Sequence, residues 1–319
     1  MVIPVLLSYS DPKNKIMHSV NHILVGLDLS KTDKQVLAYT KELAALLSPK
    51  RITFVNVHAT VTIPKEIAEQ FPDVKSDIDD RYIGEMVRET NNFNVFGVEQ
   101  VFRAMEGNPL PKLIELVENE AVDLLIVGKR VDGSRSAVSH RKLVRKAPCD
   151  VVVVPGEINS VLNRILVPVD FSANSKDAVE RALFLAKLSG GEVICHHVYE
   201  VPIGYSKTGK SFTEFAEIMR GHAENSMSEF LKDIPTDGML IETSYSLTGD
   251  NDVVHDILSA ARSNDSDMIV VGAKGRTNLA AVFMGSIAEG LAEHDRELPV
   301  FVVHPVNERF GFIDVIKSA

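Results

Sequence analysis

The sequence has few of the residues that mark secreted, zinc-binding or membrane-spanning proteins. Its 319 residues include two cysteines, Cys149 and Cys195, and no tryptophan. Two cysteines so far apart make neither a disulfide framework nor the paired spacing of a zinc site. Both lie in or beside apolar runs, so we expect buried thiols. No apolar run approaches the roughly 20 residues that span a bilayer.

The chain also lacks a net positive charge and signs of export. Residues 1–7 are apolar but have no basic segment, and the apolar part is short for a signal peptide. We therefore expect a cytoplasmic protein without a membrane partner. The net charge of −10 argues against a nucleic-acid partner. An anionic nucleotide remains compatible with this charge, because backbone dipoles act locally on a bound anion.

The chain does contain one sequence pattern that occurs twice. An apolar run ends at Asp28, Ser30 follows, and an amphipathic helical pattern comes next; Asp170 and Ser172 repeat this arrangement 142 residues later. In each copy the serine is a candidate N-cap. Four more strand-like runs correspond in order, at 51–58, 97–103, 124–128 and 150–155 and at 192–199, 239–245, 268–272 and 300–305. Self-similarity at this period indicates two tandem domains.

The repeat sets the predicted domain boundaries. A chain of this length favours two domains of roughly 150 residues. We place the first domain at 22–156 and the second at 163–305, with 157–162 as the linker. Residues 1–21 form an N-terminal extension, which is compatible with an edge strand, an arm over a partner or a disordered lead. Residues 306–319 form a C-terminal tail.

The strands alternate with helical patterns and are too continuously apolar for a sheet with one exposed face. This pattern predicts an α/β fold in which each domain has a parallel five-stranded sheet with helices on both faces. In such folds ligands bind beyond the carboxyl ends of the strands. Asp170 and Gly272 each end a strand, so both are expected at the binding edge.

The most informative stretch follows the fourth strand of the second copy. Gly272 and Gly275 are followed, after nine intervening residues, by Gly285–Ser286 at the start of a helical pattern. Glycine lets the backbone approach an anion closely, and a helix start offers free N–H groups. Lys274 and Arg276 either offset phosphate charge or are solvated surface residues. We interpret the stretch as a nucleotide-phosphate loop; the alternative is an ordinary glycine-rich strand–turn–helix junction.

Taken together, these residues resemble the universal stress protein family. The resemblance is carried by Val167-Pro168-Val169-Asp170-x-Ser172, His197-Val198, Gly272-x2-Gly275-x9-Gly285-Ser286 and Pro299. It covers both halves, so the chain is similar to a tandem member of the family. The resemblance implies two Rossmann-like domains of the HUP type, similar to the adenine nucleotide alpha-hydrolases.

The resemblance further implies that the second half binds ATP, with Mg²⁺ as a possible companion. Pro168 and Val169 would line the adenine pocket, and Val198 would offer backbone groups to adenine. Asp170 would approach the ribose or the metal; the alternative is a helix-capping or loop role. The residues that would surround the ribose and phosphates are Gly272, Lys274, Gly275, Gly285, Ser286 and Ile287, with Arg276 as a flanking cation.

The first half departs from this pattern. The third residue after Gly128 is Val131 rather than glycine. Only 20 residues separate Gly128 from Pro148, whereas 27 separate the equivalent pair in the second half, so seven residues are missing from the phosphate segment. Gly26 replaces the proline that precedes the strand-ending acid. We predict that the first half keeps the fold without binding ATP in the usual way, and that Asp28 is structural.

Residues 204–211 match the P-loop pattern G-x4-G-K-S literally. A true P-loop leaves its strand directly, whereas residues 200–203, with a proline, separate this stretch from the strand before it. No acid-ended strand follows that would hold Mg²⁺. We therefore expect a mobile polar loop here, which could close over a nucleotide.

The expected function is ATP binding in a regulatory or stress-response role, in which ATP orders residues 272–286 and alters an interaction surface for a protein partner. No residue is evident as a general base for turnover. Two alternatives remain open: an interaction module that binds no nucleotide, and a slow ATP hydrolase using Asp170 with Mg²⁺ or a self-phosphorylating protein with Ser286 as acceptor.

The last strand of each copy ends at a proline, Pro155 or Pro305. We expect these two strands to cover each other's edges, so that the halves form an intramolecular pseudo-dimer. Further dimerisation of the whole chain is also expected.

Overall fold

The computed structural model describes residues 19–60, 64–71, 74–130, 139–156, 162–249, 252–275, 285–294 and 297–305. Most of the N-terminal extension, the linker and the C-terminal tail lie outside these ranges.

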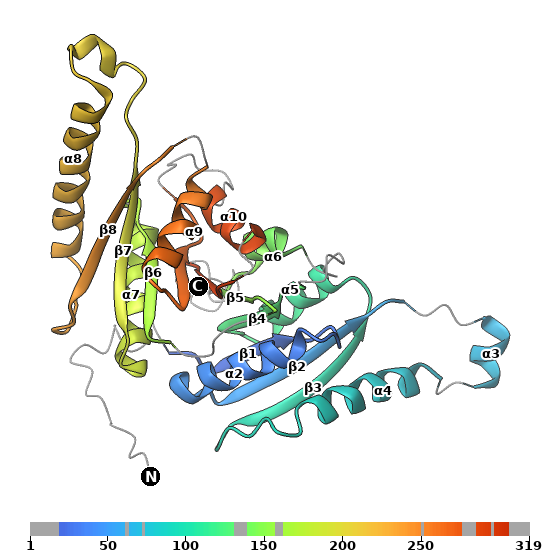
Figure 1. Cartoon of the computed structure of the whole chain (residues 1–319). Coiled ribbons are helices and arrows are strands. Elements are labelled where there is room, and N and C mark those ends of the chain that lie inside the picture. Colours follow the sequence, from blue (N-terminus) through green and yellow to red (C-terminus); the bar gives the residue numbers. More distant parts are fainter. Residues whose placement is uncertain are drawn as a thin grey trace, which may run out of the picture.

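Ten strands form one continuous sheet (Figure 1). The first half supplies β1 His22–Gly26, β2 Arg51–His58, β3 Glu99–Glu106, β4 Leu124–Gly128 and β5 Asp150–Val154. The second half supplies β6 Arg164–Pro168, β7 Glu192–Tyr199, β8 Ile241–Leu247, β9 Met268–Gly272 and β10 Val300–Val303. Their order across the sheet is β3-β2-β1-β4-β5-β10-β9-β6-β7-β8.

Within each half all neighbouring strands are parallel. The halves meet at β5 and β10, which pair antiparallel with Val152 opposite Phe301. The predicted α/β fold with two parallel five-stranded sheets is therefore confirmed, and the two last strands lie side by side as neighbours in one sheet.

The helices form a layer on each face of the sheet. One layer contains α2 Asp33–Leu47, α4 Val74–Glu89, α7 Ala173–Ser189 and α8 Phe212–Lys232, whose buried residues join one apolar cluster. The other contains α5 Pro109–Asn119, α6 His140–Lys146, α9 Val253–Ser263 and α10 Ser286–His294, which join a second cluster. The remaining helical segments are α3 Lys65–Gln70 and the short 3-10 helix η1 Tyr205–Thr208.

The alternation of side chains along the strands explains the two clusters. Ile23 and Val25 of β1 point into the first cluster, and Leu24 between them points into the second. Because both faces are covered by helices, most positions of such a strand are apolar, which produces the continuous runs seen in the sequence. Both cysteines are buried, as expected.

The repeat extends to individual hydrogen bonds. In the first half, Asp123 Oδ2 accepts the backbone N–H groups of Asn21 and His22, at 2.7 and 2.9 Å. In the second half, Asp267 Oδ2 accepts those of Asn163 and Arg164, at 2.9 and 3.0 Å. An acid at the start of the fourth strand thus anchors the start of the first strand in both copies.

The helix starts differ between the copies. Ser172 caps α7 as predicted, since its hydroxyl accepts the Ser175 N–H at 3.2 Å. The same prediction for Ser30 is wrong: α2 begins only at Asp33, after Thr32, whose side chain makes no capping bond. The Asp33 carboxylate instead accepts the Leu29 N–H at 2.7 Å.

Among the helices that the structure describes, none has both the length and the apolar character needed to cross a membrane.

Candidate functional site

A cavity of about 540 Å³ opens at the carboxyl ends of β6, β7 and β9, in the second half of the chain. It gathers ten of the residues that the sequence analysis selected: Pro168, Val169, Asp170, Val198, Gly272, Lys274, Gly275, Gly285, Ser286 and Ile287. The remaining selected residue, Arg276, lies outside the described residues. The sequence pattern and the cavity therefore indicate the same place in the fold.

The glycines of the predicted loop lie where side chains would not fit easily. A Cβ on Gly272 would lie 2.6 Å from the carbonyl oxygen of Asn174, at the start of α7. A Cβ on Gly275 would lie 3.1 Å from Asp170 Oδ2, and one on Gly285 would lie 3.3 Å from the Gly275 backbone nitrogen. These positions bring the backbone close to the strand-ending acid and close to the opposite end of the loop.

The two ends of the loop are joined by backbone hydrogen bonds. The Gly285 N–H donates to the carbonyl of Ala273 at 3.0 Å, and the Ala273 N–H donates to Val303 at 2.9 Å. The start of α10 is thereby held over the end of β9. Ser286, Ile287 and Ala288, the first residues of α10, line the cavity. A helix start at this place presents unpaired N–H groups and the positive end of a helix dipole.

Asp170 is tied to the start of α7. Its Oδ1 accepts the Ser175 hydroxyl at 2.5 Å and the Ser172 N–H at 3.0 Å, and its own N–H donates to Ser175 Oγ at 3.1 Å. Its other carboxylate oxygen faces Gly275. Asp170 therefore stabilises the strand–helix turn with one oxygen and contributes the other side of its carboxylate to the wall of the cavity.

Two adjacent histidines add to the wall. His197 Nδ1 donates to the Val169 carbonyl at 2.7 Å, and its ring packs against Phe171 with centroids 4.4 Å apart. His196 is buried with its ring nitrogens 3.1 and 3.0 Å from the hydroxyls of Ser244 and Ser246. Burial, with the charge of His197, lowers the pKa of His196 to about 4, so its ring is neutral near pH 7.

The rest of the wall is mainly apolar. Residues that the sequence analysis did not select include Val253 and Ile257 of α9, Val271 of β9 and Ala288 of α10. An apolar wall at one end and a glycine loop with Lys274 at the other suit a ligand with a flat apolar ring and an anionic tail. Within the described part of the chain, no group of three His, Cys, Asp or Glu side chains could hold a metal ion.

The P-loop-like stretch lies elsewhere. Tyr205–Thr208 form η1, and Ser211 is the N-cap of α8, where its hydroxyl accepts the Glu214 N–H at 3.2 Å while Glu214 accepts the Ser211 N–H at 2.8 Å. None of residues 204–211 lines the cavity. The serine of the P-loop pattern therefore serves a helix cap.

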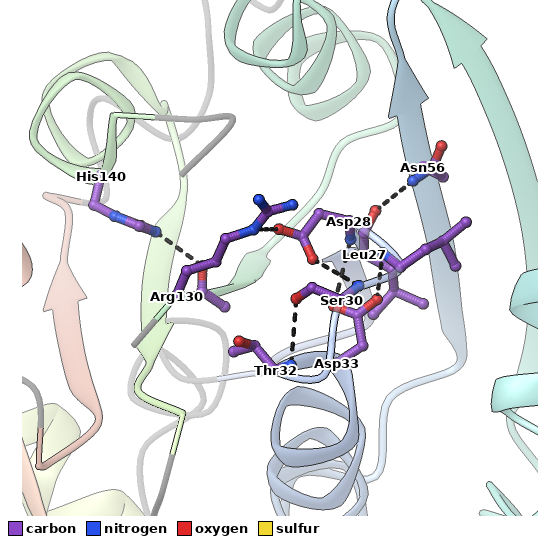
Figure 2. A network of polar contacts seen from close by, with 10 residues as sticks. Leu27, Asp28, Ser30, Thr32, Asp33, Asn56, Arg130 and His140 are labelled. Atoms are coloured by element: carbon purple, nitrogen blue, oxygen red, sulfur yellow. Dashed lines mark hydrogen bonds and ion pairs between the residues drawn. The ribbon is translucent and has the colours of Figure 1, made fainter. Parts of the chain in front are cut away.

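The equivalent position in the first half is nearly closed. A cavity of about 50 Å³ remains at the ends of β1, β2 and β4. Arg130 Nε pairs with Asp28 Oδ2 at 2.6 Å, and His140 Nε2 donates to the Gly128 carbonyl at 2.9 Å (Figure 2). Leu113 of α5 also lines what is left of the space. Protein side chains thus occupy the region that stays open in the second half.

Comparison with known proteins then identifies the family to which the chain belongs. The family model described as the universal stress protein family matches residues 19–155 and again residues 162–304. This chain belongs to the universal stress protein family. A universal stress protein of Methanocaldococcus jannaschii is 26% identical over 160 residues, which cover 45% of this chain and 96% of that protein. Universal stress protein Sll1388 of Synechocystis sp. is 24% identical over 153 residues, 44% of this chain and 97% of that protein.

Solved structures agree on the fold. The crystal structure of a universal stress protein from Archaeoglobus fulgidus covers 90% of this chain and 97% of its own, with a TM-score of 0.57 and 20% identity. Each of the two relatives corresponds to about one half of this chain. The chain is therefore a tandem universal stress protein, and the resemblance stated from its motifs is confirmed.

The two universal stress protein copies differ in one buried residue that bears on acid–base behaviour. Asp33 in the first copy stands where Ser175 stands in the second. It is buried beside Asp28, and burial together with the charge of Asp28 raises the pKa of Asp33 to about 7. The first copy therefore has a carboxyl that is about half protonated near neutral pH in the turn where the second copy has a hydroxyl.

Replacing Asp33 by serine should remove a pH-dependent loss of stability. An unfolded aspartate titrates near about 4, whereas Asp33 in the folded chain titrates at about 7. Between these values the folded state holds a proton that the unfolded state has released, so the free energy of unfolding falls as pH rises. We expect Asp33→Ser to be more stabilising, relative to wild type, at pH 8 than at pH 5 in urea unfolding. The exposed Asp80→Ser serves as the control, and an unchanged pH dependence in Asp33→Ser would contradict the assignment.

Proposed function

We propose that this chain is an ATP-binding universal stress protein in which the second half holds the nucleotide. The observation that carries the proposal is the cavity at the ends of β6, β7 and β9, which gathers the strand-ending acid, the glycine loop and the start of α10. Its volume of about 540 Å³ lies within the range of roughly 300–1,000 Å³ typical of small-molecule sites.

The residues on the wall suit the parts of ATP. Pro168, Val169 and Val198 supply the apolar end for adenine, and Val198 also supplies backbone groups. Asp170 stands between the two ends, toward the ribose or a Mg²⁺ ion carried by the nucleotide. The residues proposed to surround the ribose and phosphates are Gly272, Lys274, Gly275, Gly285, Ser286 and Ile287, with Arg276 as a further cation.

The first half is proposed to serve as a scaffold. Its equivalent space is about a tenth as large, 50 against 540 Å³. Asp28, the counterpart of Asp170, pairs with Arg130. We propose domain boundaries at 22–156 and 163–305, and an intramolecular pseudo-dimer supported by the pairing of β5 with β10.

The proposed role is regulatory. ATP bound by the second half acts on the loop from Gly272 to Ser286, of which residues 276–284 lie outside the described residues, and changes a surface that a protein partner recognises. We place the chain in the cytoplasm, as a homodimer without nucleic-acid or membrane partners. Neither histidine of the wall is placed as a general base would be: His196, with its pKa lowered to about 4, is held between two hydroxyls, and His197 donates to the Val169 carbonyl.

The test is direct detection of nucleotide. Purified full-length protein is denatured, the released small molecules are identified by mass spectrometry, and the nucleotide-free protein is titrated with ATP by calorimetry, with and without Mg²⁺. We expect one ATP for each chain. Absence of both co-purified nucleotide and binding at millimolar ATP would favour an interaction module without nucleotide. Steady-state phosphate release, or phosphate on Ser286, would favour the enzymatic alternative.

A further inference from the structure

The first half contacts α10, the helix whose N-terminus lines the cavity of the second half. Helices α6 and α10 pack side by side where the halves meet (Figure 1). Arg141 of α6 forms an ion pair with Glu289 of α10. Lys129, which follows β4, donates to the carbonyls of Ala292, at 3.2 Å, and Glu293 in the last turn of α10.

These contacts fix both ends of a nine-residue helix from the other half of the chain. A cation at the last carbonyls complements the negative end of the helix dipole. Position 129 corresponds to Ala273 in the second half, since the N–H groups of Lys129 and Ala273 donate to the last strand of their own half, at Val154 and Val303. The second half has only a methyl group where the first half supplies this lysine.

The partner of Arg141 is a buried acid near the proposed phosphate site. Glu289 is 5% exposed and lies in the first turn of α10, directly after the three residues that line the cavity. Three residues of helix span about 5 Å along its axis, which is within the Debye length of about 8 Å at physiological salt. An uncompensated carboxylate there would oppose the binding of an anion and reduce the effect of the helix dipole.

The geometry points to Arg141 as a specificity-determining residue of the nucleotide site: by neutralising Glu289 it permits the start of α10 to accept the phosphates. This inference rests on the proposed function of the second half. It also assigns a task to the first half. The hydrogen bond from His140 to the Gly128 carbonyl fixes the start of α6 next to Arg141. His140 also lines the small cavity of the first half, so a side chain that narrows the first cavity helps to position the arginine that acts on the second.

The inference predicts a loss that falls on the phosphates and spares the nucleoside. For Arg141→Ala in the full-length chain we expect ATP to bind about three- to tenfold more weakly, the range of a partly exposed ion pair near a charged ligand, while adenosine binds as it does to wild type. Glu289→Gln should bind ATP at least as well as wild type. Adding Arg141→Ala to Glu289→Gln should then cause no further loss.

The test is calorimetric titration, which measures the affinity of wild type and of each variant for ATP and for adenosine. Lys142→Ala, which removes a neighbouring cation of the same helix, is the matched control, and thermal unfolding verifies that each variant is folded. Unchanged ATP affinity in Arg141→Ala would overturn the inference, and so would an equal loss for ATP and adenosine. Failure of wild type to bind ATP would instead refute the proposed function itself.

Discussion

Replacing Gly275 and Gly285 together by valine will abolish ATP binding and leave the fold intact. A Cβ at position 275 would lie 3.1 Å from Asp170 Oδ2, and one at position 285 would lie 3.3 Å from the Gly275 nitrogen. Valine adds two further carbons at each place, in the wall of the cavity where the backbone is proposed to approach the phosphates. We expect ATP affinity to fall more than about 100-fold, because both close backbone approaches and the helix start are obstructed.

Gly275 and Gly285 are chosen so that the substitutions affect nucleotide binding without disturbing the fold. Gly272 is unsuitable for the test, because its Cβ would lie 2.6 Å from the Asn174 carbonyl and would disturb the packing of α7. Gly204→Val is the matched control, since a Cβ there meets nothing within 4 Å and the residue lies outside the cavity wall. Calorimetry measures affinity, and thermal unfolding measures the fold. Retained affinity in a folded double variant would refute the assignment of the loop.

Much of the fold was predictable because its signals are local and repeated. Strands buried on both faces give continuous apolar runs, and two copies of each run allow one copy to verify the other. The third strands begin two residues later than predicted, at Glu99 and Ile241 rather than 97 and 239, because these edge strands are polar and leave a weaker pattern. The cap prediction at Ser30 is wrong because the helix begins three residues later, at Asp33: the Ser30 hydroxyl accepts the Thr32 N–H at 3.3 Å within the turn before α2.

The cavity was predictable in part for a similar reason. Glycine spacing and a strand-ending acid leave a pattern in the chain, and those residues do line one cavity. His196, Val253 and Ile257 also line it, yet each reads as an ordinary strand or helix residue in the sequence. Their place in the wall follows from how α9 packs over β7 and β8, which no local pattern encodes. The one available signal in the sequence is that His196 stands where the first half has Val55, so a polar residue replaces an apolar one at the equivalent strand position.

Unlike the pairing of the two last strands, the side-chain contacts between the halves left no pattern in the sequence. Arg141 and Glu289 are 148 positions apart, and each reads as a solvated charge on a helix. Asp150, at the start of β5, and Arg181 of α7 also pair between the halves, and they form the most buried ion pair described in the chain, with exposures of 0% and 1%. An arginine within an amphipathic helix predicts an exposed residue, and only the approach of a second domain buries it.

Removing the carboxylate of Asp150 will destabilise the chain severely. Asp150 Oδ2 lies 3.0 Å from an Arg181 guanidinium nitrogen, and Oδ1 accepts the His304 N–H at 2.9 Å. Asp150→Ala leaves a buried guanidinium and a buried N–H without their acceptor, so we expect the free energy of unfolding to fall by about 3–5 kcal/mol. Urea unfolding measures the change. Glu99→Ala, which removes the exposed pair with Arg51, should cost less than about 1 kcal/mol.

Combining Asp150→Ala with Arg181→Met should recover most of the lost stability, because no buried charge remains. No recovery in the double variant would show that Asp150 acts through other contacts.

The ion pair between Asp150 and Arg181 also bears on which strands pair where the halves meet. Position 181 corresponds to Tyr39 in the first half, a buried residue without charge. If β5 paired with a second β5 rather than with β10, Tyr39 would replace Arg181 opposite Asp150, and the buried acid would lose its cationic partner. The ion pair therefore penalises that alternative and favours the pairing of β5 with β10.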